Sequence, residues 1–260
     1  MTSENITSMH DAVILSEMAA EAGAIMLANG AEIYRVEDTV ERILRSQESI
    51  RDVDVFSSFN VIIISFSYKG EIHSNMRRVK TRSNNLHYVD KVNTFSRDFS
   101  KGMYSLEEAL LEIKNIKKSE GTKVSLKVLG ATVAAGAYSI LLGAGMAEII
   151  SSFIVGFLGY ELSLILEKNK LNYFVVHFFY GIFVSLLSII INSFLPISID
   201  VVIISSMMAF VPGIMITNAV RDLMSGDATS GMTGSVMAIL ISTALALGVA
   251  VPIGLLGLVK

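Results

Sequence analysis

The chain has 260 residues, 52% of them hydrophobic, and its mean hydropathy of +0.57 is high for a soluble protein of this length. The net charge of −3 averages two unlike halves, because only ten charged residues follow Val128, and it says little about partners. We expect no nucleic-acid partner. The sequence contains no cysteine, which excludes disulfide bonds and thiolate metal ligands.

This uneven charge predicts two domains. Residues 1–122 are expected to form a soluble α+β domain, and residues 123–260 an all-α membrane domain. The first ten residues, MTSENITSMH, lack the basic start of a signal peptide, so we expect the soluble domain to stay on the cytoplasmic side.

The soluble domain is expected to have the element order ααβββαα. Apolar residues recur at helical spacing from Ile14 to Ile25, and Asn29-Gly30 ends that helix. A Lys69-Gly70 turn joins the last two strands as a hairpin, since glycine adopts a positive φ at little cost. The later elements cover residues 31–47, 53–56, 60–68, 71–80, 84–99 and 105–119, the last starting with Ser105 and Glu108 in capping-box spacing.

Catalysis in the soluble domain has little support. Glu32, Glu37 and His87 are the best acid–base candidates, and they would make the protein a membrane-anchored hydrolase. With Arg35 and Arg42 on the same helix, the two glutamates are better explained as a solvated helix face with ion pairs. The sequence has no nucleophile elbow, phosphate loop or metal-spaced His/Asp pair, so we expect no enzyme, no cofactor and no metal.

Five transmembrane helices are expected in the second half. Each apolar run is long enough to cross a hydrocarbon core of about 30 Å at about 1.5 Å per helical residue. The first and last runs are rich in glycine and alanine, which marks faces for helix contacts within the chain or in an oligomer. The runs cover about residues 128–145, 149–166, 172–195, 199–216 and 232–259.

Basic residues predict the orientation. Five lysines between residues 114 and 127 precede the first run, and Lys168, Lys170 and Arg221 then fall on the same side, with Lys260 on the other. By the positive-inside rule, we expect a multi-pass protein of a bacterial inner membrane with its N-terminal domain in the cytoplasm.

A cluster of charge interrupts the apolar half in the stretch VPGIMITNAVRDLMSGDATSGMTG, residues 211–234. Pro212-Gly213 breaks the fourth run, and a helix over about residues 214–225 would place Asn218, Arg221 and Asp222 on one side. Broken helices of this kind recur at transporter binding sites, whereas a plain cytoplasmic loop is the alternative interpretation.

Three stretches resemble the threonine/serine exporter family. PGIMITNAVRDLMSGDATSG resembles its hallmark order of Pro-Gly, Thr-Asn-Ala, Arg-Asp-Leu, Gly-Asp and Ser-Gly. NGAEIYRVEDTVERI resembles its Gly-Ala-Glu…Arg-Val-Glu segment, so Gly30, Glu32, Arg35 and Glu37 form a family motif in the soluble domain. NNLHYVDKVNTFSRDFSKGMYSLEEAL is similar to the segment that joins the β region to the last soluble helix.

The resemblance implies a secondary exporter of small metabolites. Full-length members of the family have more spans than the five expected here, so the chain resembles the larger subunit of the split form. Its partner would be a small membrane protein of about four or five spans, in the manner of transporters built from two halves. Some split members are associated with succinate, so the substrate is expected to be threonine, serine or a dicarboxylate. A non-transporting sensor subunit is the other alternative.

The charged stretch supplies the hypothesis for the site. Arg221 would clamp a substrate carboxylate, because a guanidinium forks onto two oxygens, and Thr217, Asn218 and Asp222 would bind beside it. Asp222 and Asp227 are candidate proton carriers, as is Glu161 inside the second run. Glu148 is a further candidate carrier, although exposure on the far side is the preferred explanation for it. His177 is expected to pair with a backbone carbonyl, and Asp200 to lie at the membrane interface without a function.

Overall fold

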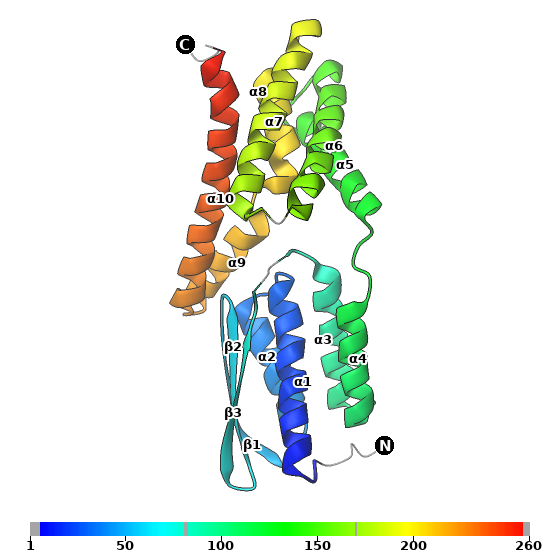
Figure 1. Cartoon of the computed structure of the whole chain (residues 1–260), viewed down its shortest axis with the longest axis vertical. Coiled ribbons are helices and arrows are strands. Elements are labelled where there is room, and N and C mark those ends of the chain that lie inside the picture. Colours follow the sequence, from blue (N-terminus) through cyan, green and yellow to red (C-terminus); the bar gives the residue numbers. More distant parts are fainter. Residues whose placement is uncertain (1–5, 81–82, 170, 257–260) are drawn as a thin grey trace. The chain divides into compact units, whose positions relative to one another are not determined.

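A computed structural model of the chain describes residues 6–80, 83–169 and 171–256, and Lys170 and Lys260 of the predicted orientation lie outside them (Figure 1). The chain divides into two compact units. The first consists of Met1–Thr122 with Ile214–Ser235, and the second of Lys123–Gly213 with Val236–Lys260. The first unit therefore contains the predicted soluble domain and adds the charged stretch to it.

The elements of residues 1–122 follow the order ααβββαα, as the sequence predicts. Ser8 and Ser105 cap the first and fourth helices in capping boxes, so the expected Ser105–Glu108 pair is present. The elements are α1 (Met9–Ala28), α2 (Ile33–Arg45), β1 (Ile50–Ser58), β2 (Val61–Tyr68), β3 (Glu71–Arg78), α3 (Leu86–Ser100) and α4 (Leu106–Lys118).

These elements form three layers (Figure 1). The antiparallel sheet β1-β2-β3 packs on α1 and α2, which in turn pack on α3 and α4. Ile62, Ile64 and Phe66 point from β2 into this core and are at most 1% exposed. The apolar alternation of β2 thus covers α1, the central helix.

The predicted hairpin between β2 and β3 is confirmed. Tyr68 pairs with Glu71, which leaves Lys69 and Gly70 as a two-residue turn with φ of 51° and 86°. Two consecutive positive φ values fit the right-handed twist of the flanking strands, and glycine adopts the second without strain.

The second unit is helical. Four helices in the described part of the chain are long and apolar enough to cross a membrane, namely α5 (Val124–Leu141), α6 (Met146–Lys168), α7 (Tyr173–Phe194) and α10 (Ala228–Leu255). The fourth expected span is instead a bent pair, in which α8 (Ile199–Met207) and the 3₁₀ turn η1 (Met208–Phe210) precede α9 (Gly213–Met224). With nine residues, α8 alone is too short to span.

Small residues bring helices of this unit into close contact, as the sequence predicts. A Cβ on Gly156 of α6 would lie 2.6 Å from the Cβ of Ala135 on α5. A Cβ on Gly181 of α7 would lie 2.6 Å from the carbonyl oxygen of Leu245 on α10, and Gly248 approaches α7 as closely. Backbones approach this closely only where side chains are absent.

Candidate functional site

The helix break predicted at Pro212-Gly213 is present. Helix α8 passes into η1 at Met208, Val211 is extended with a ψ of 128°, and α9 begins at Gly213. Proline lacks an N–H and clashes with a preceding helical turn, which explains the interruption. The two helical segments bend by 59° at this point.

Aromatic side chains surround the end of α8. The Tyr180 hydroxyl donates to the carbonyl of Ser206 at 2.6 Å, and its ring stacks on Phe210 with 3.8 Å between centroids. The rings of Tyr160 and His177 each lie 5.8 Å from that of Phe210. A carbonyl near a broken helix at membrane depth needs a polar partner, and Tyr180 supplies one.

The end of α9 is closed by backbone hydrogen bonds. Gly226 has a φ of +92°, its N–H donates to the Leu223 carbonyl at 3.2 Å, and the Asp227 N–H donates to the Asp222 carbonyl at 2.9 Å. This pair of bonds is a Schellman motif, so the C-cap predicted at Gly226 is confirmed. Asp227 then caps α10, because its Oδ1 accepts from the Ser230 N–H at 3.1 Å.

Helix α9 and the start of α10 lie against the family motif of the soluble domain, within the first unit. Three polar contacts join segments that are 172 to 189 residues apart in the sequence. They are the hydrogen bond from Asn218 Nδ2 to the Gly30 carbonyl at 3.0 Å, the ion pair of Arg221 with Glu32, and the approach of Ser230 Oγ to Ser58 Oγ at 3.5 Å. We refer to these three as the docking contacts.

Gly30 is suited to its place in this interface. Its φ of +90° lies in the left-handed region, and a Cβ there would approach the Asn84 side chain to 3.0 Å. The residue therefore turns the chain sharply between α1 and α2, and its carbonyl remains available to Asn218. The positive φ therefore explains why a glycine occupies this position of the motif.

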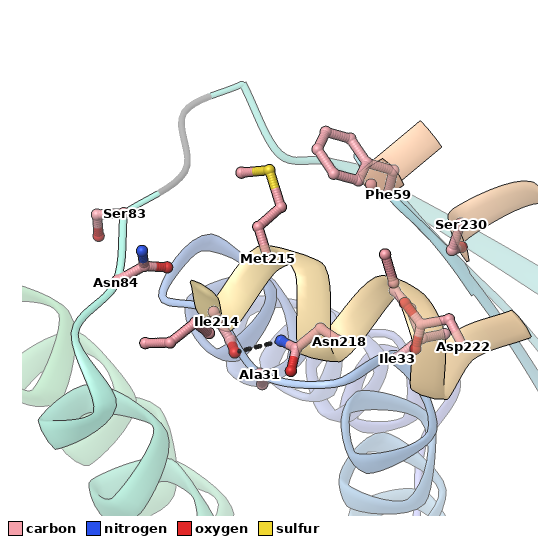
Figure 2. A pocket seen from close by; sticks show the side chains of 13 residues that line it. Ala31, Ile33, Phe59, Ser83, Asn84, Ile214, Met215, Asn218, Asp222 and Ser230 are labelled. Carbon is pink, nitrogen blue, oxygen red and sulfur yellow. Dashed lines mark hydrogen bonds between the residues drawn. The ribbon is translucent and has the colours of Figure 1, made fainter. Parts of the chain in front are cut away.

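A cavity of about 40 Å³ lies beside the docking contacts (Figure 2). Asn218 and Asp222 of α9 point toward it, with Asn84 and Phe59 from the soluble domain on other sides. Asp222 is 6% exposed, a burial that is unusual for a carboxylate. The space accommodates a few water molecules and is far below the roughly 300 Å³ of an ordinary ligand site.

Carboxylates gather near this cavity. Glu37 Oε1 accepts from the backbone N–H of Ser57 at 2.7 Å. Burial raises the pKa of Glu37 above its ordinary value, and the negative charges of Asp227, Glu41 and Asp222 raise it further against the effect of the Ser57 bond. Glu37 thus belongs electrostatically to the same acidic group as two of the predicted proton carriers.

The interpretation of α2 as a solvated, ion-paired face is only partly correct. Arg35 does pair with Glu32, at 3.4 Å, and Arg42 with Asp38. The Glu32 side chain, however, is only 13% exposed and pairs with Arg221 of α9, and Glu37 is half-buried. Helical spacing alone did not show that a distant segment covers this face.

The other predicted residues lie in varied settings. Thr217 is exposed on α9, and Glu161 is half-buried on α6 of the second unit. His177 Nδ1 lies 2.7 Å from the Tyr173 carbonyl, which agrees with its expected structural role. His87 is exposed on α3, and no hydrogen bond or ion pair between described residues joins it to Glu32 or Glu37. Glu148 accepts from the Ser198 N–H at 3.1 Å, and Asp200 is exposed at the start of α8.

Sequence reasoning missed several residues of the interface. Ser58 ends β1, Phe59 lies in the turn after it, and Asn84 lies before α3. Turn residues carry no periodic signal, so only their position next to two motif segments could have drawn attention to them. Ser230 had a local signal, since it follows Asp227 at the spacing of a helix cap.

No group of three His, Asp or Glu side chains in the described ranges is arranged to hold a metal ion. A family model, ThrE, described as "Putative threonine/serine exporter", matches residues 17–256, which includes both segments of the interface. Comparison with curated proteins and with solved structures gives no match.

Proposed function

Because the chain belongs to the threonine/serine exporter family, we propose that it exports small carboxylate-bearing metabolites, namely threonine and serine or a dicarboxylate such as succinate. The family and the apolar helices make it a multi-pass membrane protein of an exporter type. The observation that carries the proposal is the interrupted helix α8–α9, whose Arg221, Asn218 and Asp222 are held at the family motif of the soluble domain.

The proposed mechanism is an exchange of carboxylates on Arg221. In the structure Glu32 occupies the guanidinium, which is the position that a substrate carboxylate would take. The Asn218 amide, now bonded to the Gly30 carbonyl, would turn to the substrate when α9 leaves the docking contacts. The 40 Å³ cavity agrees with this order of events, because it is too small for a metabolite until α9 moves away.

Proton coupling is proposed for the acidic group at the same interface. Asp222 and Asp227 are the carriers inferred from the sequence, and Glu37, with its raised pKa, joins them. Release of α9 would move Asp222 away from Glu37 and so remove one of the negative charges that raise the pKa of Glu37. Glu161 belongs to the second unit and is a separate candidate.

The proposal also covers the side of the membrane on which the N-terminal unit lies, and a partner protein. The N-terminal unit is placed in the cytoplasm of a bacterial inner membrane, which the lysines before α5 support. Since the chain has no cysteine, a single Lys101→Cys variant labelled from each side of oriented vesicles tests this placement. The partner, a small membrane protein of about four or five spans, follows from the sequence resemblance and forms an arm of the transport experiment.

The test is transport by purified protein in vesicles, with and without the partner, under an imposed pH gradient. Vesicles loaded with threonine, serine or succinate are expected to release one of them faster than protein-free vesicles. Arg221→Gln should lower the rate about tenfold or more at equal protein, since it removes a charge-assisted bond. Arg97→Gln, on an exposed face of α3, is the matched control and should transport normally. Equal rates for wild type and Arg221→Gln would refute the role of this guanidinium.

A further inference from the structure

A second cavity lies in the first unit and takes no part in the docking contacts. Its volume is about 280 Å³, close to the roughly 300 Å³ at which ordinary small-molecule sites begin. Its floor is an apolar stretch of α1 that includes Ala24, Ile25 and Ala28. The end of β3 and residues of α3 and α4 form the walls.

The walls of this cavity are strongly basic. Among the described residues, four cations line it, Arg77, Arg78, Lys80 and Lys117, against one carboxylate, that of Glu21. The Glu21 side chain is only 14% exposed, and it pairs with both Arg77 and Lys117. Arg78 and Lys80 are exposed, and no carboxylate of a described residue pairs with either. The described lining of the cavity thus has an excess of three positive charges.

We propose that this cavity binds a small dianion, specifically a dicarboxylate with a short apolar chain. One carboxylate would bind Arg78 and Lys80, and the other would compete with Glu21 for Arg77 and Lys117. The methylene groups between them would lie on the apolar floor from α1. In the structure Glu21 takes the place of the second carboxylate and keeps two of the cations paired.

The cavity adjoins the docking contacts along the chain. Asn29 lines it, and the next residue, Gly30, accepts the hydrogen bond of Asn218. The backbone of Ser83 also bonds to the Ala28 carbonyl at 2.7 Å, and Ser83 lines the smaller cavity. A bound dianion would therefore contact the turn that holds α9. Its effect on transport rests on the proposed function, whereas the binding does not.

The test is calorimetric titration of the purified full chain at constant ionic strength with succinate, inorganic phosphate, acetate and threonine. Succinate is expected to bind at least about tenfold more tightly than acetate, because only a dianion occupies both pairs of cations. The Arg78→Gln/Lys80→Gln variant should lose about tenfold or more in succinate affinity. The control Arg51→Gln/Lys101→Gln removes the same charge from exposed positions elsewhere and should bind normally.

Glu21→Gln tests the role assigned to the carboxylate of the cavity. It frees Arg77 and Lys117 and removes a repelling charge, so succinate affinity should rise severalfold in the folded variant. If this variant does not fold, the double variant and its control decide the matter. Equal affinity of those two for succinate, or binding of acetate as tight as that of succinate, would overturn the proposal. Tighter binding of phosphate than of succinate would also overturn the assignment of a dicarboxylate.

The two sites are separated by repeating the titration with Arg221→Gln. That variant should bind succinate in the basic cavity with unchanged affinity even though its transport is slowed. If Arg221→Gln abolished all succinate binding, the ligand would be at the export site and the second site would be refuted. A chain that binds succinate normally but transports nothing would refute the proposed function and leave the cavity assignment intact.

Discussion

Replacing Glu32 by glutamine should tighten substrate binding if a substrate carboxylate and Glu32 compete for Arg221. Opposite charges about 4 Å apart attract by about 4 kcal/mol at an effective dielectric constant of about 20. The Arg221 side chain is 47% exposed, however, and Glu32 also has Arg35 as a partner. Solvent screening then leaves about 1 kcal/mol for the pair, which corresponds to about a fivefold change in affinity. Glu32→Gln is therefore expected to lower the apparent Kd about fivefold, whereas Arg221→Gln raises it.

The assay is titration of the transported substrate into the full chain, together with the substrate dependence of efflux from vesicles. Glu48→Gln, an exposed change of the same kind, is the control and should leave the Kd unchanged. If Glu32→Gln tightens substrate binding and Arg221→Gln weakens it, Glu32 competes with the substrate for the guanidinium and does not position it. If Glu32→Gln weakened binding as Arg221→Gln does, Glu32 would position the guanidinium for the substrate, and the exchange mechanism would be wrong.

Three further predictions concern the docking contacts, the acidic group and the helix crossing. Ser58→Cys/Ser230→Cys should form a disulfide on oxidation, since the two Oγ atoms are 3.5 Å apart and the chain has no other cysteine. Efflux should stop in the oxidised protein and return when reductant is added. Full efflux from the oxidised protein would contradict the need for α9 to move. Burial and neighbouring carboxylates raise the pKa of Glu37, so its contribution to stability is complete below its unfolded value near 4.5 and is lost as the pH rises through the folded pKa. Glu37→Gln should therefore raise the Tm at pH 7.5, and the gain should shrink toward pH 4.5; a lower Tm at every pH would show that the bond to Ser57 needs the carboxylate. Gly248→Ala should destabilise the chain in detergent by about 1–3 kcal/mol, because its Cβ would overlap the carbonyl oxygen of Phe178, while Gly254→Ala in the same helix meets nothing within 4 Å and should be neutral or stabilising.

Local chemistry explains which parts of the fold were predictable. The Lys69-Gly70 turn, the Ser105 cap and the Pro212 break all depend on conformational preferences of a few adjacent residues. Helix α10 is long and apolar, so its place in a membrane follows from composition. Such features need no knowledge of what lies elsewhere in the chain.

The partners of the charged stretch were not predictable in the same way. Glu32 and Arg221 are 189 residues apart, and each has a satisfactory local explanation, one in a helix face and the other in a positive-inside loop. The ion pair of Glu32 with Arg221 forms only where α9 lies against α2, and no local pattern encodes that contact. The fourth span was expected as one run to residue 216, yet α9 continues to Met224 and lies in the first unit from Ile214.

Under the proposed mechanism, in which α9 leaves the docking contacts, these contacts favour a substrate that carries a carboxylate. A neutral hydrogen bond and a half-exposed ion pair each contribute about 1 kcal/mol, so the three contacts together hold α9 by about 3 kcal/mol, or roughly a hundredfold in population. A solute releases α9 only if it binds the released form better by a comparable factor. A carboxylate on Arg221 replaces the Glu32 pair with an equivalent one, so only the Asn218 and Ser230 contacts remain to be offset. A neutral solute would have to offset all three and would leave the guanidinium without an anion.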